Sequence, residues 1–177
     1  MKRILALALC LIMALALVAC GGAKEADYKL GMGVVVSMGS SKTGNAQVDA
    51  TVATVVTDAD GKSVACRIDV AQNKMNVTDG AVDTAKTFET KMELGSRYGM
   101  EGKVDNDGNG VMLEWDAQAK AFEAFVVGKT GAEVAALETQ EAGGHLIAVD
   151  SALLEAGCSM QITGLMAVVA QAATNAR

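Results

Sequence analysis

The sequence predicts an α+β fold, in which an antiparallel sheet from the N-terminal half carries C-terminal helices on one face. Three observations indicate this arrangement. Residues 32–70 hold three segments in which side chains alternate with period two. An Asp-Gly pair stands between the last two of these segments. Beyond residue 113, apolar residues recur at intervals of three and four, as they do on one face of a helix.

The first three strands are expected at residues 32–38, 48–56 and 64–70, and each is typical of a half-buried antiparallel strand. The linker Asp58-Ala59-Asp60-Gly61-Lys62 supplies the positive φ that a tight hairpin requires. In the third strand Cys66 falls on the apolar face. Residues 72–92 predict more sheet, with a turn at Thr78-Asp79-Gly80 and a further alternating stretch from Phe88 to Met92.

The segment GVVVSMGSSKTGNAQV, residues 33–48, superficially resembles a strand that runs into a phosphate-binding loop. Such a loop leads from a strand into a helix and places Gly directly before Lys. Here Ser41 precedes Lys42, and a strand follows from Gln47. We therefore expect a loop between two strands and no nucleotide site.

Helices are expected in the C-terminal part. Trp115, Ala119, Phe122 and Val126 form an apolar stripe that ends at Gly128. A capping box at residues 130–133 opens a short helix, a loop follows around residues 143–145, and residues 150–156 form a helical turn that Gly157 stops. The last helix begins near Thr163 and is expected to bury four side chains: Met166, Val169, Ala170 and Ala173.

The N-terminus, MKRILALALCLIMALALVAC, has two cations followed by about 15 apolar residues, which is typical of an export signal. It is short for a membrane-spanning helix, which needs roughly 20. The small residues before Cys20 resemble the lipobox of bacterial lipoproteins, in which the cysteine is diacylated. We therefore expect a signal peptide at residues 1–19, lipidation of Cys20, a spacer at residues 20–27 and a single α+β domain at residues 28–177. An ordinary signal peptide with a chance cysteine is the alternative.

Without residues 1–19 the chain has 158 residues, which is the size of one domain. Its formal charge changes from −6 to −8, which argues against nucleic acid or anionic lipid headgroups as partners. Cys66 and Cys158 would either form a disulfide or stay free as small apolar residues. With one histidine and no Cys-x-x-Cys pair, a zinc site is not expected.

The glycine-rich segment from Glu93 to Gly110 is the expected location of a binding site, because long loops in compact domains are frequently functional. Tyr98 lies in this loop and Trp115 just beyond it, where the two rings would flank a planar ligand; packing in the core is the alternative for Trp115. His145 has no neighbouring nucleophile and is expected at the surface. No catalytic residues are predicted, and the chain is not expected to be an enzyme.

Residues 105–116 match the spacing of a calcium loop, with Asp105, Asp107, Asn109 and Asp116 at the first, third, fifth and twelfth places and Gly110 at the sixth. The twelfth residue is Asp where such loops have Glu, and no helix precedes the loop. A solvated turn is the favoured interpretation, because Asn, Asp and Gly are common in turns.

Four segments of the chain are similar to a family of uncharacterised lipoproteins from anaerobic Firmicutes: AQVDATVATVVTDADGKSVACRIDVAQNK, TKMELGSRYGM, EWDAQAKAFEAFVVGKT and VDSALLEAGCSMQITGLMAVVAQAATNAR. The opening strands and their Asp-Gly turn also resemble the FMN-binding domains of extracytoplasmic electron-transfer lipoproteins. Those domains attach the flavin through an Asp-x-x-Ser-Gly-Ala-Thr motif. Residues 79–84 lack its Ser-Gly-Ala core, so the resemblance implies a shared fold without the covalent flavin.

The sequence thus leads to one hypothesis with one alternative. The hypothesis is a membrane-anchored extracytoplasmic lipoprotein that binds a small molecule, with noncovalent flavin as one candidate. The alternative is a structural or interaction module of the cell envelope without a ligand.

Overall fold

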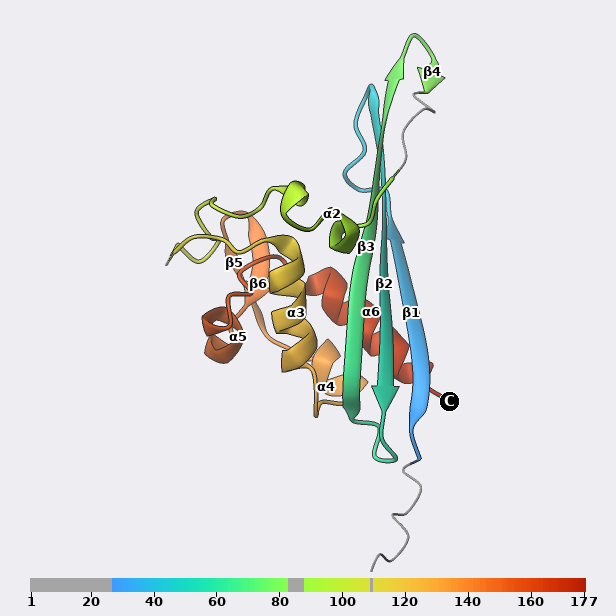
Figure 1. The fold of residues 1–177 in the computed structure, drawn as a ribbon, viewed down its shortest axis with the longest axis vertical. Coiled ribbons are helices and arrows are strands. Elements are labelled where there is room, and N and C mark those ends of the chain that lie inside the picture. The colour runs from blue at the N-terminus through green and yellow to red at the C-terminus, as the bar shows by residue number, and fades with distance from the viewer. Residues whose placement is uncertain (1–26, 83–87, 109) are drawn as a thin grey trace, which may run out of the picture.

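The computed structural model describes residues 27–82, 88–108 and 110–177. It has a long antiparallel sheet from the N-terminal half and helices in the C-terminal half, which confirms the predicted α+β class (Figure 1). The four-stranded sheet has the order β1-β2-β3-β4. Its strands are β1 (Lys29–Ser37), β2 (Asn45–Thr57), β3 (Ser63–Thr78) and β4 (Ala81–Val82).

In the segment that resembles a phosphate loop, residues 38–44 form the loop between β1 and β2, and a strand follows as predicted. The β2–β3 hairpin also forms at the predicted place, with Gly61 at φ 76°. Beyond it, β3 continues to Thr78 and turns through Asp79 (φ 52°) and Gly80 into the short β4.

The strand predicted from Phe88 to Met92 is wrong. Thr90 instead caps the helix α2 (Lys91–Leu94): its side chain accepts from the Glu93 amide while the Glu93 carboxylate accepts from the Thr90 amide. This reciprocal pair satisfies two free amides at the helix start. The 3₁₀ helix η1 (Gly95–Tyr98) follows directly.

The C-terminal part holds α3 (Trp115–Phe125), α4 (Gly131–Ala135), β5 (Thr139–Ala142), β6 (His145–Ala148), α5 (Ser151–Glu155) and α6 (Thr163–Thr174). The predicted capping box opens α4, and Gly157 follows α5 with φ 89°. The loop predicted around residues 143–145 is the turn of a hairpin between β5 and β6, which the sequence analysis missed.

Helices α3 and α6 lie against the same side of the sheet, with α6 crossing β1 and β2 and α3 alongside β3 (Figure 1). We call this side the inner face. The core between them holds Ala53, Val55, Cys66, Ile68, Trp115, Phe122, Val168 and Val169. The buried face of α6 is made by Leu165, Val168, Val169 and Ala172. Of the four residues predicted to be buried, only Val169 is correct. The other three, Met166, Ala170 and Ala173, are partly buried.

Helix α6 approaches β1 closely because two inner positions of that strand, Gly31 and Gly33, are glycines. A Cβ atom on Gly31 would meet the Ala172 carbonyl, and one on Gly33 would meet the Val168 carbonyl. Apart from Val35, which packs against the core, the large apolar side chains of β1 point to the other side of the sheet, which we call the outward face. Leu30, Met32, Val34 and Val36 are all exposed there.

Polar side chains from the helices form hydrogen bonds with backbone groups at both edges of the sheet. At the β3 edge, the Glu123 carboxylate accepts from the Ile68 amide at 2.7 Å and pairs with Arg67 at 2.8 Å. At the β1 edge, Gln171 accepts from the Val34 amide and Asn175 donates to the Met32 carbonyl. Capping of this kind leaves fewer free backbone groups for pairing with other strands.

Candidate functional site

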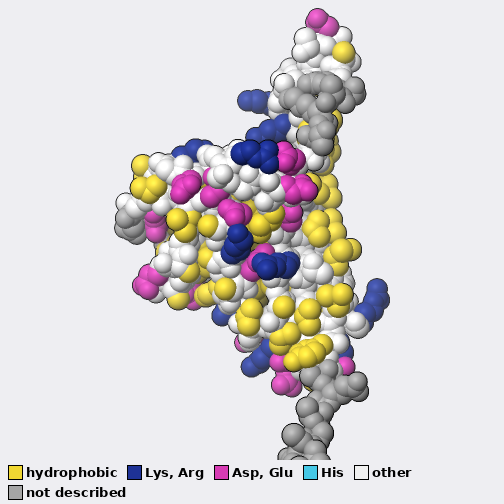
Figure 2. Space-filling model, viewed as in Figure 1, with side chains coloured by type: hydrophobic (Ala, Val, Ile, Leu, Met, Phe, Trp, Pro, Cys, Tyr) yellow, Lys and Arg dark blue, Asp and Glu magenta, His cyan; other side chains and the backbone are white. Residues whose placement is uncertain are grey.

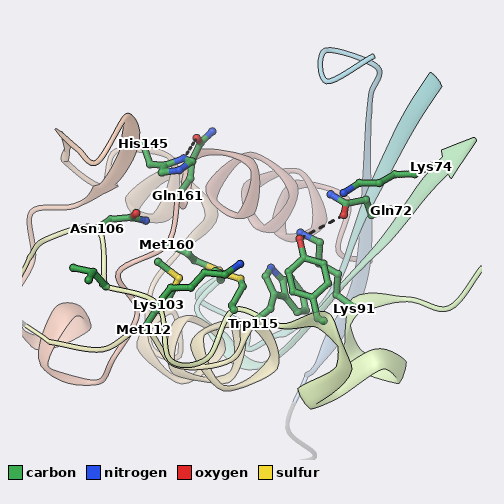
Figure 3. A pocket seen from close by; sticks show the side chains of 13 residues that line it. Gln72, Lys74, Lys91, Lys103, Asn106, Met112, Trp115, His145, Met160 and Gln161 are labelled. Carbon is green, nitrogen blue, oxygen red and sulfur yellow. Dashed lines mark hydrogen bonds between the residues drawn. The ribbon is translucent and has the colours of Figure 1, made fainter. Parts of the chain in front are cut away.

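A cavity of about 620 Å³ opens between the inner face of β3, the segment that follows α2, and the start of β6 (Figure 3). Its size is within the usual range for small-molecule sites. The lining residues are Gln72, Lys74, Lys91, Tyr98, Met100, Lys103, Val104, Asn106, Met112, Trp115, His145, Met160 and Gln161.

The cavity is cationic. Lys74, Lys91 and Lys103 come from three different segments of the chain, and no carboxylate is among the described residues that line the cavity. The chain as a whole has a formal charge of −6, so this composition is opposite in sign to the rest of the molecule. Three ammonium groups facing one cavity favour an anionic ligand.

The two aromatic rings and one lysine form a group at one end of the cavity. The Lys91 Nζ lies 4.6 Å from the centroid of the Tyr98 ring and 5.2 Å from that of Trp115. These are cation–π distances, which hold the ammonium beside the rings. The Tyr98 hydroxyl lies 3.5 Å from the Gln72 side-chain oxygen on β3.

The floor of the cavity is apolar and belongs to the core. Trp115 is 3% exposed, and Met112 and Met160 are buried beside it. Methionine side chains adapt their shape to a bound group. The cavity therefore combines an apolar floor with a cationic rim, which suits an amphiphilic or aromatic anion.

Glu114 fixes the segment that forms the cavity wall. This buried carboxylate accepts hydrogen bonds from four backbone amides: Gly99, Met100 and Glu101 at 3.1–3.3 Å and Trp115 at 3.0 Å. Burial alone would raise the pKa of Glu114, but the four amides outweigh it, so that the pKa lies below its ordinary value. Glu114 is thus an anion that joins the loop after η1 to the start of α3.

Gln118 performs a similar role on the other side of the cavity. Its fully buried amide donates to the Leu113 carbonyl at 2.7 Å and accepts from the amides of Ser159 and Met160 at 3.1 and 2.8 Å. The Asn106 side chain donates to the Ser159 carbonyl at 2.8 Å. These bonds position Met160 and the loop around Lys103 relative to α3.

Both of the predicted ligand-binding residues, Tyr98 and Trp115, line this one cavity. The burial of Trp115 also places it in the core, which was the alternative interpretation. The predicted lipidation site, Cys20, and the signal peptide lie outside the described residues. Residues 79–84 were compared with the flavin-attachment motif. Of these, residues 79–82 form the turn and strand at the tip of the β3–β4 hairpin, and Thr84 lies outside the described residues.

No sequence pattern predicted the three lysines of the cavity, because residues 74, 91 and 103 share no motif. His145 is exposed as expected, but it lies on the cavity rim, with its Nδ1 atom 3.4 Å from the Gln161 side-chain oxygen. Its place after Gly143-Gly144 was the only sequence signal of a turn at this position.

Asn109, at the fifth place of the calcium-like spacing, lies outside the described residues, and several of the other members contact the protein. Asp105 and Gly110 are joined by a backbone hydrogen bond, and an isolated bridge pairs Val104 with Val111. Asp116, at the twelfth place, pairs with Lys120 at 2.7 Å. Among the described residues, no three His, Cys, Asp or Glu side chains are grouped so as to hold a metal ion.

Cys66 and Cys158 are free and buried, so the open question of a disulfide is answered in favour of two separate thiols. Burial raises the pKa of each thiol to about 12, with the nearby Glu123 charge adding to the effect at Cys66. Neither side chain lines the cavity. Within the part of the chain that the structure describes, no helix is long and apolar enough to cross a membrane.

Comparisons of the chain with protein-family models, with curated proteins and with solved structures gave no match.

Proposed function

We propose that this chain is a membrane-anchored extracytoplasmic lipoprotein that binds a planar organic anion without transforming it, with FMN held noncovalently as the first candidate. The anchor is the diacylated Cys20 predicted from the N-terminal sequence. The observation that supports binding is the cavity, in which three lysines and two aromatic rings meet an apolar floor with no carboxylate among its described lining residues.

FMN has the two properties that such a cavity would recognise. Its ring system is planar and apolar, as the floor of Trp115, Met112 and Met160 requires, and its phosphate carries the negative charge that lysines attract. A phosphate that contacts Lys74 or Lys103 would leave Lys91 beside the aromatic rings. When bound, FMN would supply one- or two-electron transfer, and the chain's own residues would bind and orient it.

Absence of enzymatic activity is part of the proposal. Serine, threonine, cysteine, aspartate and glutamate are not among the described cavity residues, and in this proposal the three lysines bind the charge of the anion. His145 is exposed, and its ring contacts the neutral side chain of Gln161. The ligand-free envelope module is the less favoured alternative, because it gives no reason for a concave cationic site.

A fluorescence titration tests the proposal. Trp115 is the only tryptophan and lies in the floor of the cavity, so binding of FMN should quench its emission. Riboflavin, which lacks the phosphate, should bind at least about tenfold more weakly if the lysines recognise the charge. Equal affinity for both compounds would refute recognition of the charge, and no quenching by either would remove the flavin.

Variants of the lysines locate the interaction. Lys103→Gln should weaken FMN binding by roughly fivefold or more, because a contact with a charged partner is worth about 1 kcal/mol or more. Lys120→Gln is the matched control, since Lys120 is exposed and lies outside the cavity. Intact-mass measurement of protein from a lipoprotein-processing bacterium tests the anchor separately: the leader should be absent and two acyl chains should be present on Cys20.

A further inference from the structure

The outward face of the sheet carries a row of large apolar side chains that no described helix covers. Six residues at alternate positions along and beside β1 are between 42% and 61% exposed: Tyr28, Leu30, Met32, Val34, Val36 and Met38. We call them the outward stripe. Figure 2 shows hydrophobic side chains gathered along the sheet side of the molecule, away from α3, β5 and β6.

The neighbouring strand extends this apolar surface. The register places Val56, Thr54, Val52 and Ala50 of β2 opposite Leu30, Met32, Val34 and Val36 of β1, so that all eight share the outward face. None of them carries a charge. The first outward charges are Arg67 and Asp69 on β3, and both are held by the protein: Arg67 pairs with Glu123, and Asp69 accepts from the Val70 and Met92 amides.

The hydrogen bonds at the β1 edge argue against strand addition by a second copy of this chain. Addition of a strand at the β1 edge is hindered, because Gln171 and Asn175 already bond to Val34 and Met32, and the Arg177 amide bonds to Leu30.

The chain that precedes the sheet indicates a different occupant. The outward stripe begins at Tyr28, eight residues after Cys20. Eight residues span at most about 27 Å, so a lipid at Cys20 would keep this face close to the bilayer. A tethered domain is present at a high effective concentration at the surface, and a contact too weak for a free protein is then sufficient.

We propose that the outward face of β1 and β2 rests on the lipid surface of the membrane to which the chain is anchored. This inference rests on the proposed function for the anchor, but not on the cavity or its ligand. Because the face is apolar and uncharged while the chain is acidic, contact with zwitterionic lipid is sufficient, and added salt should change it little. Tyr28 suits the boundary between headgroups and acyl chains, where aromatic residues with a polar tip are enriched.

Docking in this orientation leaves the cavity accessible. Gln72 of β3 pairs with Asp49 of β2, which pairs with Ser37 of β1, and these positions alternate with the outward ones. Gln72 and Lys74 of the cavity therefore lie on the inner side of the sheet. A ligand would enter from the side that faces away from the lipid.

Quenching by brominated lipid tests the orientation. The full chain is produced in a lipoprotein-processing bacterium and reconstituted into phosphatidylcholine vesicles whose acyl chains carry bromine near the headgroup. Tryptophan is introduced either in the outward stripe, as Val36→Trp, or at an exposed position in β6, as Leu146→Trp. The buried Trp115 of the parent protein gives the background signal.

If the outward face lies on the lipid, the Val36→Trp variant should lose roughly half of its added tryptophan emission, since apolar faces that lie on a membrane enter it by about 5–10 Å. The added emission of the Leu146→Trp variant should not be quenched. A doubly substituted Val34→Thr, Val36→Trp protein keeps the β propensity and should be quenched less. Equal quenching at both positions, or none at Val36→Trp in lipidated protein, overturns the proposal. A dimer in solution that shields the tryptophan at position 36 without lipid also overturns the proposal.

The mass of the same preparation separates failure of the anchor from failure of the docking face. If Cys20 is unmodified, the proposed anchor is wrong, and the soluble variants are added to the vesicles at high lipid concentration. Selective quenching of Val36→Trp then still supports the docking face, and its absence overturns it.

Discussion

Replacing Glu114 with Gln should destabilise the protein strongly, although the two side chains have almost the same shape. The carboxylate accepts four backbone amides, from Gly99, Met100, Glu101 and Trp115. A carboxylate has two acceptor oxygens, whereas a carboxamide has one and turns an NH₂ group toward the donors. In the Glu114→Gln variant, about two of the four amides lose their acceptor.

The size of the effect follows from these contacts. A buried amide left without an acceptor costs about 1–3 kcal/mol, and bonds to a charged acceptor are stronger than those to a neutral one. Two lost amides and two weakened bonds together give a destabilisation of about 3–4 kcal/mol. With a urea dependence of roughly 2 kcal/mol per molar, the midpoint of unfolding should fall by about 1.5–2 M.

Urea unfolding followed by Trp115 emission measures this change, because the single tryptophan is buried directly beside the substituted residue. Glu101→Gln is the control: it removes the same charge from an exposed side chain of the same segment. A decrease below about 0.3 M urea for Glu114→Gln, or an equal decrease for Glu101→Gln, would refute the importance of the four bonds, since surface substitutions stay within about 0.5 kcal/mol.

The same carboxylate makes stability depend on pH in a defined direction. The four amides hold the pKa of Glu114 below its ordinary value of about 4.3, so the group binds protons more weakly in the folded than in the unfolded state. Its contribution is complete above the ordinary pKa and is lost as the pH falls through the lowered one. Glu114→Gln should therefore flatten the acid limb of a stability profile between pH 5 and the folded-state pKa.

Three further predictions concern packing, buried polar contacts and thiols. Gly33→Ala should destabilise the folded protein by about 1–3 kcal/mol, because the new methyl group meets the backbone of α6. Gly164→Ala, in α6, has open space around it and should stabilise the folded protein by about 0.5–1 kcal/mol. Thermal unfolding of the two variants tests both expectations. Gln118→Leu should cost about 2–4 kcal/mol in urea unfolding, since it removes three buried hydrogen bonds. Cys66 and Cys158, with pKa values raised to about 12, should resist a thiol reagent at pH 8 in the folded protein and react in urea; fast reaction of the native protein would contradict their burial.

Local patterns predicted most of the helices and strands because local interactions determine them. The Asp-Gly turn, the apolar stripe from Trp115 and the capping box at Thr130 each involve residues within a few positions of one another. The strand predicted at 88–92 failed for the same reason: a second capping box, Thr90 with Glu93, outweighs the alternation there. The β5–β6 hairpin was missed because each strand has only four residues, and TQEA carries little β propensity.

The cavity depends on contacts that are distant in sequence, and local patterns predicted only part of it. Tyr98 and Trp115 were identified because they flank a glycine-rich segment. Lys74 and Lys103 belong to a strand and a loop that become neighbours only when Glu114 and Gln118 fix the loops around α3. No periodicity or spacing in the sequence records that arrangement.

Strand β1 connects the two proposals, because its alternation is opposite to that of an ordinary surface strand. Gly31 and Gly33 face the helix, and apart from Val35 its large apolar residues face away from the core. The glycines are explained by the close approach of α6, which would clash with any Cβ atom at Gly31 or Gly33. That requirement does not explain the apolar residues at the intervening positions, where Thr or Ser would serve a solvated strand equally well. A lipid surface on the outward face would account for these apolar residues, and it would orient the cationic cavity away from the membrane, where a soluble anion would reach it.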